Sequence, residues 1–282
     1  MLISTRHALR YVAPLREGGS LPAIVETDGG SYVVKFRGAG QGARALLAEL
    51  IVGGIAQALG LPLPDLAVVE LGDGFGRAEP DPEIQDILRG SGGPNVGLRY
   101  LEGAFPYDPV AAADLVSPRL ASEIVWLDAL TTNIDRTARN PNLLIVREAD
   151  GPALYLIDHG AALYFHHDWS SMTPERARAP FPAIRDHVLL PLASEILDVD
   201  ADLAPLLTDG VLADVLDAVP DALLMDAPPG REAAFATPAA NRAAYAGVLR
   251  SRLEGPRAFA EEAARAHETA RTTPAVPLGY RR

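Results

Sequence analysis

The alternation of apolar and polar residues over the first hundred positions predicts short strands and one prominent helix. Residues 22–37, PAIVETDGGSYVVKFR, contain two apolar runs separated by Thr-Asp-Gly-Gly, which is typical of a β-hairpin. Over residues 43–59 the leucines and isoleucines recur at spacings of three and four, so a helix is expected there. The same criteria predict three further elements: strands at 66–71 and 95–101 and a short helix at 82–90.

The second part of the chain has a different pattern. Residues 102–109, EGAFPYDP, have the turn-rich composition of a linker, and residues 119–133 follow as an amphipathic helix. Two strands are predicted at 142–148 and 153–158, and from about residue 191 to 266 the chain is rich in Ala and Leu with helical periodicity.

These elements predict an α+β, bilobal outline. We expect a small β-rich N-lobe with one main helix over residues 1–104, and a larger, mainly helical C-lobe over residues 105–270. Residues 271–282, which end in two arginines, are expected to form a flexible tail.

Composition and charge narrow the classes of function. The chain has 282 residues, no cysteine and a net charge of −12. Disulfides, thiolate nucleophiles and cysteine metal sites are therefore excluded, and direct binding to nucleic acid is not expected. The polar start of the chain does not resemble a signal peptide, and no apolar run reaches membrane-spanning length, so we expect a cytoplasmic protein without membrane contact.

The candidate chemistry is concentrated in TTNIDRTARNPNLLIV, residues 131–146. Asp135 and Asn140 are five positions apart, the spacing of D-x-x-x-x-N in protein-kinase catalytic loops. In such a loop a carboxylate faces the attacking hydroxyl while a carboxamide oxygen reaches a magnesium ion on the phosphates. Arg136 is expected to steady either the loop or the transferring phosphate. Asp158, followed by His-Gly, ends a predicted strand and stands where a metal-binding carboxylate would follow.

Residues upstream complete a nucleotide site. Lys35 ends the second strand of the hairpin, as the phosphate-binding lysine of kinases does, and Glu49 lies on the next helix, where it could pair with that lysine. The turn REGGSLP, with Gly18, Gly19 and Ser20, is the candidate for covering the phosphates, although it does not match G-x-G-x-x-G.

Each of these residues also has an ordinary structural interpretation. Asn and Asp favour turns, a lysine at a strand end is commonly solvated, and a glutamate commonly occupies an exposed helix face. The order of the parts favours a site: lysine on a strand, acid on the following helix, D-x-x-x-x-N after a helix and D-x-G after a strand. His159, His166, His167 and Asp168 lack the spacing of a transition-metal site and are interpreted as packing residues.

The sequence resembles the bacterial HipA-like kinase family over roughly residues 10–255, which include all of the candidate site residues named above. The resemblance implies a bilobal protein-kinase-like fold and a serine/threonine kinase that uses ATP and Mg²⁺. It assigns Asp135 as the catalytic residue, Asn140 and Asp158 as metal ligands, and Lys35 with Glu49 at the phosphates. Thr137 stands where many members have His, and no A-P-E segment or long activation loop follows Gly160. The segments that carry the resemblance are GGSLPAIVETDGGSYVVKFRGAGQGARALLAEL, EPDPEIQDILRGS, NVGLRYLEGAF, WLDALTTNIDRTARNPNLLI, LIDHGAALYFHHDW and PFPAIRDHVLLP.

Three classes of function remain open. The chain could be a protein serine/threonine kinase, a kinase of a small molecule or lipid of phosphatidylinositol-kinase-like type, or a nucleotide-binding pseudokinase that acts as a regulatory module. The partner is then an unidentified protein or small-molecule substrate. Because HipA toxins work with an antitoxin, the resemblance also raises a regulatory protein partner as an expectation.

Overall fold

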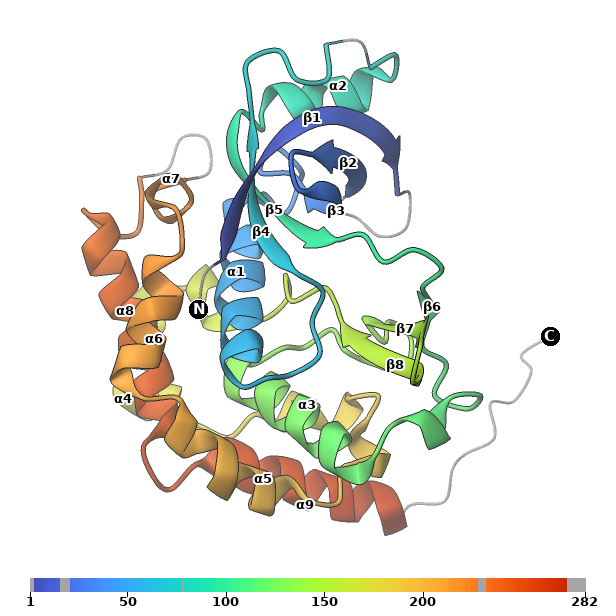
Figure 1. Cartoon of the computed structure of the whole chain (residues 1–282). Coiled ribbons are helices and arrows are strands. Elements are labelled where there is room, and N and C mark those ends of the chain that lie inside the picture. The colour runs from blue at the N-terminus through green and yellow to red at the C-terminus, as the bar shows by residue number, and fades with distance from the viewer. Residues whose placement is uncertain (1–2, 16–20, 78, 228–231, 273–282) are drawn as a thin grey trace, which may run out of the picture.

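The structure, a computed structural model, describes residues 3–15, 21–77, 79–227 and 232–272. Within these residues it is a mixed α+β fold in which five strands close into a barrel and three strands form a separate sheet (Figure 1). The α-helices are α1 (Gly42–Ala58), α2 (Pro82–Arg89), α3 (Pro118–Thr131), α4 (Pro174–Ala177), α5 (Ile196–Leu203), α6 (Asp209–Asp217), α7 (Asp221–Leu224), α8 (Pro238–Leu253) and α9 (Ala258–Thr272).

The barrel contains the predicted hairpin and closes through a strand that the sequence pattern does not reveal. Its strand order is β1-β2-β3-β5-β4, and the ring closes because β1 pairs antiparallel with β2 and parallel with β4. β1 consists largely of half-exposed and exposed positions, so it lacks the apolar alternation by which strands are found. The strands are β1 (Ser4–Pro14), β2 (Ala23–Thr27), β3 (Gly30–Lys35), β4 (Leu66–Leu71) and β5 (Gly93–Arg99).

Helix α1 is buried on nearly all sides. Its side chains pack against β4 and β5 of the barrel and against α6 and α7 of the helical part, and Leu50, Ile51 and Ile55 are fully inaccessible. A helix that is apolar around its whole circumference is stable only in such a position. The largest hydrophobic cluster accordingly runs without a break from the barrel through α1 to α3 and the C-terminal helices.

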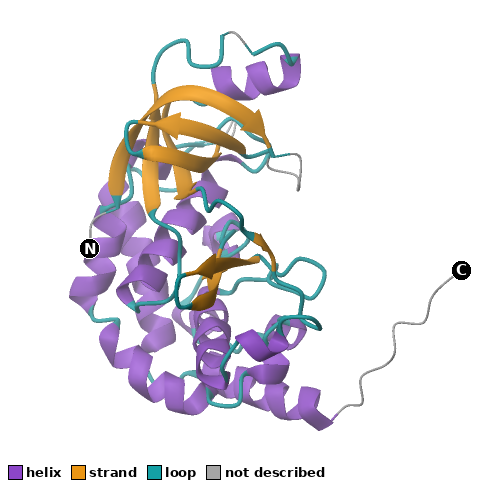
Figure 2. Ribbon diagram, turned by 45° about the vertical axis from the view of Figure 1, so that its right-hand side comes forward, coloured by secondary structure: helices purple, strands orange, loops and turns teal. Residues whose placement is uncertain are grey.

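The second sheet lies below the barrel and beside α3 (Figure 2). It consists of β6 (Phe105–Pro106), β7 (Leu143–Glu148) and β8 (Gly151–Leu156), all antiparallel, in the order β6-β7-β8. Alternate residues of β7 and β8, including Leu143, Ile145 and Leu156, enter the same core as α3. The two strands predicted in this region are thereby confirmed, and the segment expected to be a linker supplies a third.

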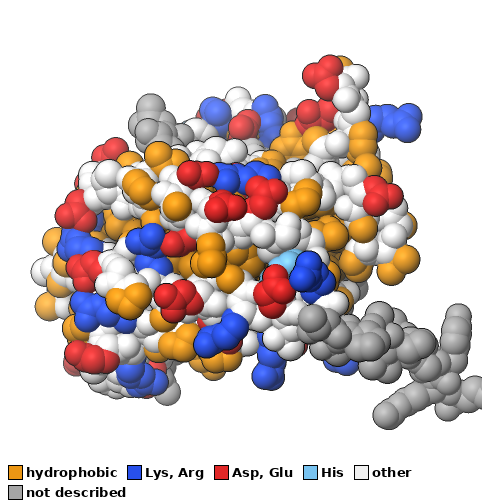
Figure 3. Space-filling model, turned by 90° about the horizontal axis from the view of Figure 1, so that it is seen from below, with side chains coloured by type: hydrophobic (Ala, Val, Ile, Leu, Met, Phe, Trp, Pro, Cys, Tyr) orange, Lys and Arg blue, Asp and Glu red, His pale blue; other side chains and the backbone are white. Residues whose placement is uncertain are grey.

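Three further observations concern the surface, the helices and the C-terminal end of the described part of the chain. Acidic and basic side chains are interspersed over the underside of the helical part (Figure 3). In the part of the chain that the structure describes, none of the helices has both the length and the apolarity needed to span a bilayer. Helix α9 ends at Thr272, so the range 271–282 expected to be a tail begins inside a helix; residues 273–282 lie outside the described part.

We predict that the core around α1 dominates stability. Ile51→Ala should lower the free energy of unfolding by about 2–5 kcal/mol, because it leaves a cavity in a fully buried cluster. Leu197→Ala on α5, where the side chain is 55% exposed, should change it by less than about 0.5 kcal/mol. Chemical denaturation of both variants measures the difference, and equal losses would contradict the packing described for α1.

Candidate active site

Lys35 joins two carboxylates that come from distant parts of the chain. Its ammonium Nζ lies 2.5 Å from Oε1 of Glu49 on α1 and 2.6 Å from Oδ1 of Asp158, which follows β8. Glu49 is almost fully buried, and its other oxygen accepts the backbone N–H of His159 at 3.0 Å. The ammonium group of Lys35 thus connects the barrel to helix α1 and to the segment that follows β8.

Burial and the neighbouring opposite charges shift the pKa values of these three groups in opposite directions. Burial lowers the pKa of the Lys35 ammonium, but the two carboxylates outweigh it and the pKa is raised. Burial likewise works to raise the pKa of the Asp158 carboxyl, but Lys35 outweighs it and the pKa is lowered. For Glu49, which is more deeply buried, burial prevails and the pKa is raised. Lys35 is therefore held charged, as binding to phosphate oxygens requires.

The segment between α3 and β7 is shaped by a capped helix and a tight turn. Ser117 caps α3 by accepting the N–H of Leu120, and the helix ends at Thr132 in the left-handed region. Backbone hydrogen bonds between Thr137 and Asn140, in both directions at 3.1 Å, then fold the chain back. This turn brings Nδ2 of Asn140 to 2.7 Å from Oδ2 of Asp135, which explains the five-residue spacing.

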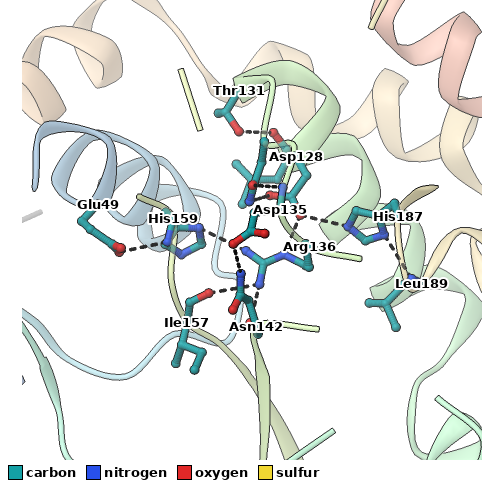
Figure 4. A network of polar contacts seen from close by, with 12 residues as sticks. Glu49, Asp128, Thr131, Asp135, Arg136, Asn142, Ile157, His159, His187 and Leu189 are labelled. Carbon is teal, nitrogen blue, oxygen red and sulfur yellow. Dashed lines mark hydrogen bonds and ion pairs between the residues drawn. The ribbon is translucent and has the colours of Figure 1, made fainter. Parts of the chain in front are cut away.

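Arg136 lies behind this loop in a completely buried network (Figure 4). Its Nε donates to Oδ2 of Asp128 on α3 at 2.5 Å, and its Nη1 donates to the carbonyl oxygens of Asn142 and, at 3.1 Å, Ile157. Its Nη2 lies 3.2 Å from Nδ1 of His159. The side chain of Arg136 thereby connects the catalytic-loop candidate, residues 132–142, to α3, to the start of β7 and to the segment that carries Asp158.

Two histidines complete the network in their neutral forms. His187 Nδ1 accepts the N–H of Leu189, so its proton is on Nε2, which donates to Asp128 at 2.9 Å. Burial lowers the pKa of His187, and burial followed by the charge of Arg136 lowers the pKa of His159 to about 3. Burial alone would raise the pKa of the Asp128 carboxyl, but Arg136 and His187 hold it far below its usual value.

A cavity of about 530 Å³ opens beside these groups. Its polar wall includes Lys35, Glu49, Asn140, Asn142 and Asp158. Its apolar wall comes from the barrel on one side and the second sheet on the other, with Val33, Val96, Leu98, Leu144 and Ile157. The volume is that of a typical small-molecule site, and an apolar wall facing a few charged groups suits a ligand with a planar ring and an anionic end.

The structure brings most of the predicted site residues together. One cavity is lined by Lys35, Glu49, Asn140 and Asp158. The side chain of Asp135 accepts a hydrogen bond from Asn140. Gly18, Gly19 and Ser20 lie outside the described residues. Of the two roles expected for Arg136, contact with a transferring phosphate requires a correction, because its guanidinium is buried and hydrogen-bonded to Asp128 and Ile157. These contacts agree with the other expectation, that Arg136 steadies the loop.

Sequence reasoning missed four contributors. Asn142, included above only as the first residue of a predicted strand, donates to Asp135 at 3.3 Å. Asp128, His159 and His187 form the buried network, and they are too far apart in sequence to give a local signal. The one available hint was an acid, Asp128, in an otherwise apolar stretch of helix.

A model of the family described as HipA-like kinase matches residues 12–176, more than half of the chain. The chain belongs to the HipA-like kinase family.

This HipA-like kinase was also compared with solved structures and with curated proteins. The proinflammatory kinase CtkA of Helicobacter pylori is 10% identical over 95% of this chain and 99% of its own, with a TM-score of 0.52, so the two share a fold. HipA of Shewanella oneidensis MR-1, from a toxin–antitoxin complex with HipB and operator DNA, is 12% identical over 90% of this chain and 67% of its own, with a TM-score of 0.43. No curated protein matches the sequence.

We predict that Asp128→Asn destabilises the chain by about 3–5 kcal/mol near neutral pH, because it leaves the buried charge of Arg136 unpaired. The unfolded chain protonates Asp128 near its ordinary pKa of about 3.9, whereas the folded chain keeps it ionised. The stabilisation is therefore complete above about pH 4 and declines as the pH falls further.

Denaturation of both proteins between about pH 3 and pH 7 measures this. The difference in unfolding free energy should shrink toward the acidic end, and a constant difference would contradict the assignment. Asp150→Asn, in the exposed turn between β7 and β8, is the matched control and should behave like the unchanged chain.

Proposed function

We propose that this HipA-like kinase is an ATP- and Mg²⁺-dependent phosphotransferase that transfers the γ-phosphate of ATP to the hydroxyl of a protein serine or threonine. The observation that carries the proposal is the joint placement of Lys35, Glu49 and Asp158 in a cavity that also contains Asn140. In this proposal the barrel side, residues 1–104, and the helical side, residues 105–270, act as two lobes with the nucleotide between them.

Each residue has a distinct task in this reaction. Lys35, kept charged by Glu49, holds phosphate oxygens of the nucleotide. Asp135 orients the acceptor hydroxyl and takes its proton as the new oxygen–phosphorus bond forms, while the bond from the γ-phosphorus to the bridging oxygen breaks and ADP leaves. Arg136 keeps Asp135 in place through its bonds to Asp128 and to the carbonyl of Asn142. The adenine ring would contact the apolar wall, with Val96 on one side and Ile157 on the other.

The residues at hand fit a magnesium ion. Mg²⁺ prefers oxygen ligands, and bound beside the phosphates it would neutralise their charge during transfer. Asn140 uses its amide nitrogen for Asp135, which leaves its side-chain oxygen available, and the Asp158 carboxylate is partly exposed toward the same cavity. No group of three His, Asp or Glu side chains within the described residues could hold a metal unaided, so phosphate oxygens would complete the coordination.

A small-molecule or lipid acceptor is the second candidate, and the segment after Gly160 favours it. The chain there forms two 3-10 turns, Tyr164–His167 and Trp169–Ser171, whose rings pack against Tyr245 of α8. It contains no extended stretch on which a peptide could lie before α4 begins at Pro174.

We predict that Asp135→Ala abolishes transfer while ATP binding changes little, because Asp135 faces the acceptor and Lys35 faces the nucleotide. Incubation with γ-labelled ATP and Mg²⁺ measures transfer, and a thermal shift with ATP measures binding. Asp150→Ala, at an exposed position in the turn between β7 and β8, is the control and should retain full activity.

The destination of the label separates the candidate functions. Label on protein supports a protein kinase, and label on a component of a small-molecule extract supports the second candidate. Unchanged turnover in Asp135→Ala would refute the assignment of Asp135. A thermal shift with ATP but no turnover in the unchanged chain would refute transferase activity and leave a nucleotide-binding regulatory module.

A further inference from the structure

A second cavity, of about 730 Å³, lies away from the residues discussed so far. It is bounded by the start of α1, by the segment 167–174 and by α8. None of the residues that bind or pair with Lys35 lines it. Its walls combine one guanidinium, several hydroxyls and two aromatic rings, contributed by Arg44, Trp169, Ser170, Thr173, Phe235 and Ser251.

Arg44 is the one arginine or lysine side chain among the described residues that line this cavity. Its side chain is half-buried and forms no hydrogen bond or ion pair with any residue in the described part of the chain. The carboxylate that lines the cavity, Asp168, accepts the hydroxyl of Ser170 at 2.6 Å instead. The guanidinium still acts on its surroundings: after burial, its charge contributes to the lowered pKa of His167. A guanidinium that forms no ion pair with a carboxylate is available for an external anion.

Gly247 leaves the floor of the cavity open at a cost in helix stability. It lies inside α8, where glycine is about 1 kcal/mol less favourable than alanine. Its φ is not positive, and a Cβ built on it would meet no atom within 4 Å. Neither backbone conformation nor packing requires a glycine here, and the space beside it is open toward the cavity that Gly247 lines.

Arg44 and Glu49 share helix α1 but point in different directions. Five residues along an α-helix rotate a side chain by about 140°, so the second cavity faces away from Lys35. A ligand in it would therefore occupy a site separate from the proposed nucleotide site.

We propose that this cavity binds a small phosphate monoester with a planar ring, with Arg44 as the group that holds the phosphate. A guanidinium binds phosphate through two parallel hydrogen bonds, and the hydroxyls of Thr173 and Ser251 supply further donors around it. Trp169 and Phe235, whose rings meet edge to face at 5.2 Å, form an aromatic wall for the ring of the ligand. The volume lies within the range of small-molecule sites.

Phenyl phosphate is the probe, and calorimetric titration of the full chain without nucleotide measures its binding. Arg44→Gln should weaken binding at least about tenfold, since it removes a charge-assisted bidentate contact. Gly247→Phe should weaken it equally by filling the floor of the cavity. Gly247→Ala is the matched control, which should bind like the unchanged chain and unfold at a higher temperature. Circular dichroism establishes that each variant is folded.

Three comparisons, with one variant and two other ligands, locate the site and define what it binds. Lys35→Met should bind phenyl phosphate with unchanged affinity, because Lys35 lies in the other cavity. Phenol should bind at least about tenfold more weakly than phenyl phosphate, because it lacks the anion. Absence of binding, or equal affinities for the unchanged chain, Arg44→Gln and Gly247→Phe, overturns the proposal. Equal affinity for inorganic phosphate overturns the requirement for a ring. Because no step of this test uses ATP, its outcome is independent of the kinase proposal.

Discussion

The buried ion pair between Arg136 and Asp128 is the interaction on which the arrangement of the site depends. Two opposite charges removed from water are stable only if both are paired and their remaining hydrogen-bonding groups are satisfied. Here Asp128 is paired with both Arg136 and His187, and Arg136 also binds carbonyls before β7 and after β8. Satisfying this one guanidinium fixes α3, the catalytic-loop candidate and the segment with Asp158 relative to one another.

Lys35 forms the corresponding connection on the other side of the cavity. Its ammonium is shared by a carboxylate from the buried helix α1 and a carboxylate that follows β8. Because Glu49 also accepts the N–H of His159, and His159 contacts Arg136, the two charged centres are joined through a single histidine. Displacement of α1 would therefore disturb both the lysine and the segment that carries Asp158.

Backbone strain is concentrated at the same place. Thr132, Asn142 and Asp158 adopt the left-handed region, which is unfavourable for residues other than glycine and especially so for a β-branched threonine. Such conformations persist where the surrounding contacts determine them, and they occur preferentially at functional sites. In this HipA-like kinase they mark the end of α3, the entry to β7 and the exit from β8.

What the sequence determined by itself is local. The hairpin, α1, α3 and the pair β7–β8 follow from periodicity and turn chemistry, and the five-residue spacing of Asp135 and Asn140 follows from a turn closed by Thr137. The tertiary structure alone decided the closure of the barrel through β1, the burial of Arg136 and the cavity at Arg44. The physical reason is that pairing, burial and charge balance depend on residues distant in sequence, such as Asp128 and His187, whose proximity no local pattern records.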